Sequence, residues 1–87
     1  MNLKRLRNEV DLIDRELLLL LRRRFLVVQK IALLKKELNL SVTDKTREMQ
    51  IKKRVQELGR DLSLEPEFLV KIFRLIIIEA KRLQKEI

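Results

Sequence analysis

The sequence predicts an all-α fold of three helices, and three observations support this prediction. Its 87 residues include only one Gly and one Pro, so few positions interrupt a helix. Apolar residues make up 46% of the chain and are mainly Leu, Ile and Val, while Lys, Arg and Glu supply most of the rest. The apolar residues recur at steps of three and four, which is the period of one helical face. A chain of this length forms one small domain, so we assign residues 1–87 to a single domain.

The first helix is expected at about residues 2–39. One apolar face runs through it, and we call this face the long stripe: Leu3, Leu6, Val10, Ile13, Leu17, Leu20, Val27, Ile31, Leu34 and Leu38. At about 1.5 Å per residue the helix would be roughly 55 Å long, which exceeds the diameter of a globule of this size. Between Leu17 and Leu21 every face of the helix is apolar. The middle of the helix therefore needs cover on several sides, and a partner subunit is the simplest cover.

The second helix is expected at about residues 44–61. Residues 39–44 precede it and compete for backbone hydrogen bonds, and Thr43 or Asp44 can cap the helix. Its apolar stripe consists of Ile51, Val55, Leu58 and Leu62. Gly59 is expected near a fraying C-terminal end.

The third helix is expected at about residues 65–86. Pro66 is acceptable in a first helical turn, and Ser63 or Glu65 can act as the cap. The stripe of this helix consists of Leu69, Ile72, Phe73, Ile76, Ile77, Ala80 and Leu83. No internal repeat, low-complexity tract or interdomain linker separates the three helices.

The composition excludes several classes of function. The sequence has no Cys and no His, which removes disulfides, thiolate zinc sites and histidine general bases, and we expect neither a metal nor a cofactor. No export signal and no apolar run of membrane-spanning length is visible, so we expect a cytoplasmic, soluble protein without a membrane partner. The net charge of +8 admits nucleic acid, anionic lipid or a small polyanion as partner. Nucleic acid is disfavoured, because no aromatic residues accompany the arginine run and acidic residues lie on every helix.

Polar residues interrupt the apolar stripes at four positions. On the long stripe the step after Leu20 is Arg24, and Lys35, eleven residues further on, returns to within about 20° of the same face. In the second helix, Glu48 lies three residues before Ile51 of the stripe. In the third helix, Gln84 lies four residues after Ala80. Two cations, a carboxylate and an amide can thus line one polar cavity in a helical bundle.

Each of these positions also has a simpler explanation. Long cationic side chains such as Arg24 and Lys35 can place their charges in water. Glu48 lies in a first turn, where the helix dipole favours a carboxylate, and Gln84 lies near a chain end. Taken singly, only Arg24 predicts a functional group. A structural coiled coil needs no more than stripes and charges, so it remains an alternative.

The four residue types together indicate the chemistry of a ligand. Arg and Lys bind carboxylates, an amide donates to a neutral oxygen, and Glu accepts from a hydroxyl. The implied ligand is a small molecule with more than one carboxylate and at least one hydroxyl. No obvious nucleophile or proton shuttle is present, so an enzyme of this kind would work by positioning and by fixed charge.

Four parts of the sequence occur in a characteristic order and spacing: LRNEVDLIDRELLLLLRRR, then Lys35, then VTDKTRE and finally FRLIIIEAKRLQ. In these features the chain resembles the all-helical, type II chorismate mutases over nearly its whole length. The resemblance implies a homodimer in which three helices from each chain interlock as a six-helix bundle with two equivalent active sites. The implied activity is the Claisen-type pericyclic rearrangement of chorismate to prephenate, in the shikimate pathway toward phenylalanine and tyrosine.

The same resemblance implies a role for each catalytic residue. Arg24 would pair with a substrate carboxylate, and Arg7 would reach into the site from the other subunit. Lys35 and Gln84 would hydrogen-bond the ether oxygen, where negative charge develops as the bond breaks. Glu48 would accept a hydrogen bond from the ring hydroxyl.

Further residues are implied to shape the substrate site. Asp44 and Arg47 belong to the DxxRE pattern beside Glu48. Ala80 stands where some family members have a serine, which removes one hydrogen bond to a carboxylate. Lys81 follows it, and the sequence does not decide whether this lysine is exposed or lines the mouth of the site.

We expect a free-standing, monofunctional chorismate mutase, because no linker to a further domain is visible. One alternative is an isochorismate pyruvate-lyase, which shares the fold and a similar cationic pocket. The complete set of Lys35, Glu48 and Gln84 favours the mutase. The other alternative is a non-catalytic, basic helical module that binds nucleic acid.

Overall fold

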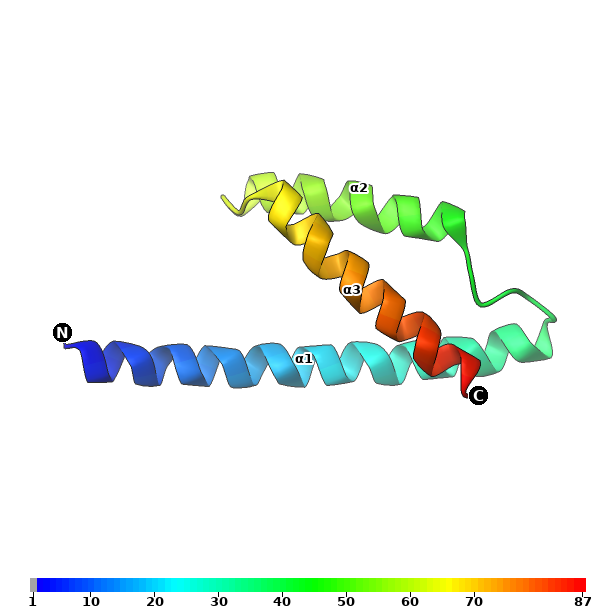
Figure 1. Ribbon diagram of the computed structural model, residues 1–87, viewed down its shortest axis with the longest axis horizontal. Coiled ribbons are helices and arrows are strands. Elements are labelled where there is room, and N and C mark those ends of the chain that lie inside the picture. Colours follow the sequence, from blue (N-terminus) through cyan, green and yellow to red (C-terminus); the bar gives the residue numbers. More distant parts are fainter. Residues whose placement is uncertain (1) are drawn as a thin grey trace.

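The computed structural model describes residues 2–87 and consists of three α-helices (Figure 1). These are α1 (Leu3–Glu37), α2 (Lys45–Asp61) and α3 (Pro66–Lys85). No strand occurs among the described residues. The all-α class is therefore confirmed, and each helix begins and ends within two residues of its predicted boundary. Within residues 2–87, no helix is long and apolar enough to cross a membrane.

Polar residues fix the places where the helices begin and end. Asn2 caps α1 and Asp44 caps α2, each by accepting a hydrogen bond from the backbone N–H three residues on, at 2.8 and 2.9 Å. Glu65 is the N-cap of α3, whose first residue is proline. The chain leaves α1 and α2 through Asn39 and Ser63, which adopt left-handed conformations with φ of 56° and 58°. Of the two candidates predicted for each cap, the structure uses Asp44 and Glu65.

Gly59 marks a close approach of α2 to α3. It is buried, and a Cβ at this position would lie 2.6 Å from Leu69 Cδ1. The backbone N–H of Leu64 also donates to the carbonyl of Gly59 at 2.8 Å, which closes the turn between the two helices. Gly59 thus lies near the C-terminal end of α2, as predicted, and this end packs against α3.

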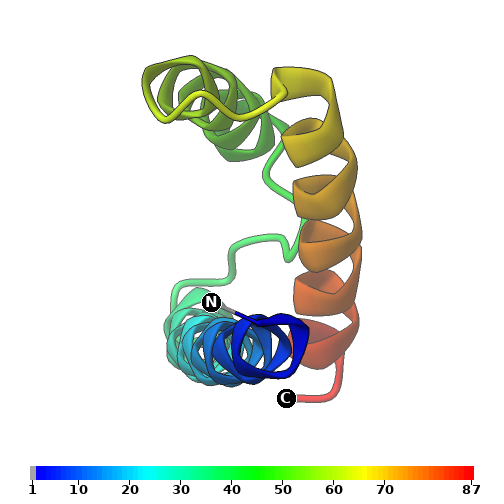
Figure 2. The ribbon, with the colours of Figure 1, turned by 90° about the vertical axis from the view of Figure 1, so that its left-hand side faces the viewer.

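Helix α3 connects the other two helices. Among residues 2–87, α2 packs along α3 and α3 crosses α1, whereas α1 and α2 do not pack against each other. Figure 2 shows α1 and α2 held apart, with α3 along one side only. The molecule measures 55 × 25 × 15 Å and has a radius of gyration of 16.1 Å. A compact chain of this length would have a radius of about 12 Å.

A single chain buries little apolar surface. Its buried hydrophobic residues are Ala32, Ile51, Val55, Val70 and Ala80. Every residue of the long stripe is exposed, including Leu17 at 60% and Leu20 at 59% in the middle of α1. A continuous apolar surface of this length is unusual in a monomer and is typical of a protein interface.

Candidate active site

Seven of the eight predicted site residues line one cavity bordered by the three helices. Its volume is about 390 Å³, which lies in the range of small-molecule sites. The lining residues are Arg24, Val27, Val28, Ile31, Lys35, Val42, Asp44, Arg47, Glu48, Ile51, Arg54, Ile77, Ala80, Lys81 and Gln84. The three helices thus bring the residues that interrupt the stripes to one place, while their individual roles stay predictions.

Arg7 is the predicted site residue that does not line this cavity. It is exposed near the start of α1. The helix rises about 1.5 Å per residue, so Arg7 lies roughly 25 Å along α1 from Arg24. This distance is too long for an arginine side chain, so Arg7 cannot serve the cavity of its own chain. Its service to another subunit stays a prediction.

Arg24 directs a guanidinium into the cavity without a counter-ion. Its Nη1 is buried and has no hydrogen-bond partner among the described residues, and its Cζ lies 5.9 Å from the centre of the Phe73 ring. Burial lowers the pKa of Arg24, and the positive charges of Arg54 and Arg47 lower it further. Arginine nevertheless keeps its proton in proteins. The cavity therefore contains an unpaired cation that an anionic ligand would stabilise.

Lys35 of α1 and Gln84 of α3 meet in the cavity. Lys35 Nζ donates to Gln84 Oε1 at 3.1 Å and to the backbone carbonyl of Val42 at 2.9 Å. An ammonium group has three donors, so one remains free for a ligand. Because the oxygen of Gln84 faces Lys35, its NH₂ group is left to donate elsewhere. The pair can therefore offer one cationic and one neutral donor to a single oxygen.

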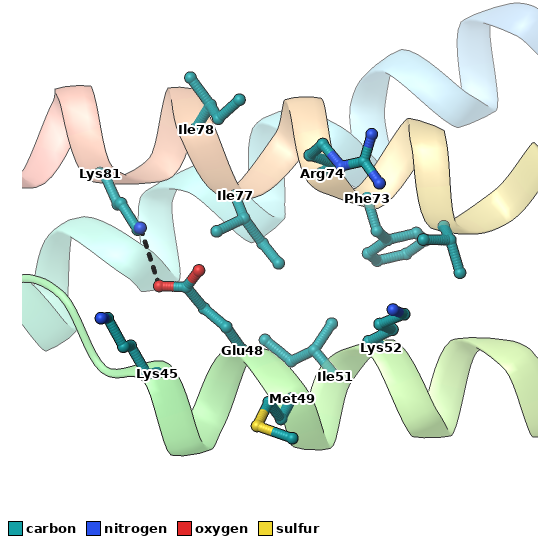
Figure 3. Close-up of a pocket in the computed structure, with 11 residues that line it drawn as sticks. Lys45, Glu48, Met49, Ile51, Lys52, Phe73, Arg74, Ile77, Ile78 and Lys81 are labelled. Carbon is teal, nitrogen blue, oxygen red and sulfur yellow. Dashed lines mark ion pairs between the residues drawn. The ribbon is translucent and has the colours of Figure 1, made fainter.

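Glu48 of α2 forms an ion pair with Lys81 of α3 (Figure 3). Lys81 Nζ lies 2.8 Å from Glu48 Oε2, and the side chains are 28% and 31% exposed. Glu48 Oε2 is buried and has no further partner within residues 2–87, so Lys81 is its one polar neighbour there. The structure thus places Lys81 at the site, whereas the sequence did not decide whether this lysine is exposed or lines the site.

Arg54 is a charged lining residue that the sequence analysis missed. It follows Arg47 by seven residues, or two helical turns, so it lies on the same face of α2. This spacing could have placed Arg54 beside Arg47 at the site. Arg54 does not interrupt the apolar stripe of α2, however, which is the feature that indicated Glu48. With Arg54 and Lys81 included, cations outnumber carboxylates among the lining residues, which suits a polyanionic ligand. No acidic cluster that could hold a metal ion occurs in the described part of the chain.

Comparison with known proteins identifies the family. A family model described as chorismate mutase type II matches residues 6–85. The chain belongs to the type II chorismate mutase family. A chorismate mutase from Methanocaldococcus jannaschii is 30% identical over 84 residues, which cover 97% of this chain and 85% of that relative.

Two further proteins are similar to this type II chorismate mutase chain. A bifunctional chorismate mutase/prephenate dehydratase from Buchnera aphidicola is 35% identical over 81 residues, which are 93% of this chain but 21% of that relative. A solved structure of a conserved hypothetical protein from Pyrococcus furiosus matches with a TM-score of 0.76 and 34% identity. This match covers 93% of this chain and 92% of the other. The family resemblance predicted from the sequence is confirmed.

Asp44 and Ala80 affect the wall of the cavity in this type II chorismate mutase chain in two different ways. Asp44 uses one carboxylate oxygen to cap α2, at 2.9 Å from the backbone nitrogen of Arg47, which fixes the start of that helix beside the cavity. Ala80 is 5% exposed and contributes only a methyl group. The wall of α3 therefore offers no hydroxyl at this position, and the neighbouring Lys81 brings a charge instead.

Proposed function

We propose that this chain is a chorismate mutase that rearranges chorismate to prephenate. The observation that carries the proposal is the partly buried guanidinium of Arg24, whose Nη1 has no partner among the described residues, in a cavity with a surplus of cations. Chorismate is a dianion, and such a cavity favours a doubly charged carboxylate over a neutral molecule. Membership of the family and the similarity to the chorismate mutase of M. jannaschii support the same reaction.

The proposed mechanism uses position and fixed charge. Within one molecule the ether C–O bond breaks while a C–C bond forms, and no proton is transferred. Arg24 would hold a carboxylate of the compact, chair-like conformer, and Glu48 would accept a hydrogen bond from the ring hydroxyl. Lys35 and Gln84 would donate to the ether oxygen as it gains negative charge. Donors that are already in place stabilise this charge without reorganisation, which lowers the barrier.

We also propose that the active form is a homodimer of six interlocked helices. The exposed long stripe supports this, since α1 extends beyond the contact that α3 makes with it and its middle is apolar on all faces. The α1 helix of a second copy offers the apolar surface of matching length that the long stripe needs. In this arrangement the partner's Arg7 would enter the cavity as a further cation.

A product assay tests the proposed reaction. Purified protein mixed with chorismate is expected to form prephenate, which acid converts to phenylpyruvate, a product detected by its absorbance. Isochorismate supplied in parallel is expected to remain unchanged. Salicylate and pyruvate from isochorismate would identify a pyruvate-lyase instead. Salt-sensitive binding of DNA without turnover of either compound would indicate a non-catalytic basic module.

Replacing Gln84 with glutamate is expected to make the activity depend on acidic pH. The amide donates at every pH, whereas a carboxyl group donates only while it is protonated. The Gln84→Glu variant should therefore lose most of its turnover near neutral pH and regain it as the pH falls. Initial rates across pH for this variant and for Gln50→Glu, which adds the same charge at an exposed position of α2, measure the effect. Equal and flat profiles would argue against donation by Gln84.

A further inference from the structure

The pair of Glu48 and Lys81 is the one ion pair that joins two helices in the part of the chain described here. The remaining ion pairs link Arg82 to Glu79 and Glu86 at the C-terminal end of α3. Glu48 and Lys81 also line a second hollow of about 400 Å³, which is bordered by α2 and α3 (Figure 3). The pair therefore borders both this hollow and the candidate active site.

A purely structural role does not explain this ion pair well. Both side chains are close to one-third exposed, and ion pairs at such positions contribute little to stability. The apolar contacts of Ile51, Val55 and Val70 already hold α2 against α3. The pair instead restricts the rotamers of the Glu48 side chain, which would otherwise rotate about several bonds.

Lys81 is placed to fix that carboxylate. It is the one cationic group at contact distance from Glu48 within residues 2–87, and it approaches from the opposite helix. A carboxylate has about four lone-pair positions. Lys81 can therefore hold one side of the carboxylate while another side remains available to a hydroxyl of the ligand. No other ion pair or side-chain hydrogen bond among the described residues orients the Glu48 carboxylate.

We propose that Lys81 is a positioning residue, which holds the Glu48 carboxylate in the orientation that accepts the ring hydroxyl of the substrate. This inference rests on the proposed function, since it assigns Glu48 to that hydroxyl. Lys81 acts through Glu48 and not through its own contact with the substrate.

The first test compares three single variants with the wild-type chain. Lys81→Met removes the charge and keeps most of the side-chain length, Lys81→Arg keeps a cation, and Lys71→Met makes the same change at an exposed position of α3 away from both hollows. We expect kcat/KM for chorismate to fall roughly tenfold or more in Lys81→Met, as for a misplaced contact. Lys81→Arg should stay within about threefold of wild type, and Lys71→Met should be unchanged. Thermal unfolding of all variants should coincide with that of the wild type.

The second test asks whether the effect passes through Glu48. In a Glu48→Gln background, Lys81→Met should change kcat/KM by less than about twofold, because residues that act as a unit are not additive. The same loss in both backgrounds would show that Lys81 acts on the substrate directly, and this would overturn the positioning role. A lower melting temperature with an unchanged KM would mean a structural role and would overturn it as well. Should Lys81→Met fail to fold, Lys81→Gln gives the same comparison.

The two proposals fail in different ways. A folded wild-type chain that does not convert chorismate would overturn the proposed function, and the role of Lys81 with it. An active wild-type chain whose Lys81→Met variant keeps full kcat/KM would overturn the role of Lys81 alone.

Discussion

The Arg24→Ala variant is expected to convert chorismate at least about 100-fold more slowly than the wild type. Arg24 carries a buried guanidinium nitrogen without a partner, and the positive charges of Arg47 and Arg54 act on it. A substrate carboxylate would neutralise this group, so its removal should cost much of the stabilisation that the cavity gives to a bound dianion. Initial rates over a range of chorismate concentrations measure the loss.

The same variant should remain folded and helical. Removing an unpaired, partly buried charge relieves desolvation and does not strand a partner. Circular dichroism and light scattering should therefore match the wild type. Arg22→Ala is the matched control, since Arg22 belongs to the same run of three arginines but is exposed and lines no cavity. Near-normal activity of Arg24→Ala would remove Arg24 from the site.

The Arg7→Ala variant is expected to lose activity to a similar extent, at least about 100-fold. This is the less intuitive result, because Arg7 is exposed on α1 and lies roughly 25 Å along the helix from Arg24 of its own chain. The loss follows if the N-terminal half of α1 enters the cavity of a second copy and brings this cation with it. Arg5→Ala removes a charge from the same exposed part of α1 and should be active. Wild-type activity of Arg7→Ala would show that one chain supplies a complete site.

The helices could be predicted from the sequence because their signals are local. The steps of three and four, the cap at Asp44, and the proline that opens α3 all act within a few residues of the structure they determine. The close packing of Gly59 against α3 could not be predicted in this way. Whether a helix end frays or packs depends on the side chain opposite, here Leu69, which no local pattern specifies.

Four of the candidate site residues also carry a local signal. Arg24, Lys35, Glu48 and Gln84 each interrupt the stripe of their own helix, so periodicity alone singled them out. The partner of Glu48 could not be found, because the contact with Lys81 depends on how α2 and α3 are packed. The long stripe gives a third case. Periodicity marks it as a face to be covered, and in the single chain it stays exposed, which is why we propose that a second copy covers it.

Mixing Arg7→Ala chains with Arg24→Ala chains tests most directly whether each site is built from two subunits. In a mixed dimer, one site would contain the intact Arg24 of one chain and the intact Arg7 of the other, while the second site would lack both. Random pairing makes about half of the dimers mixed, so about one quarter of all sites should be intact. We predict that refolding the two inactive variants together restores about one quarter of the wild-type turnover. Turnover no higher than that of the variants refolded separately would contradict a site shared between two chains.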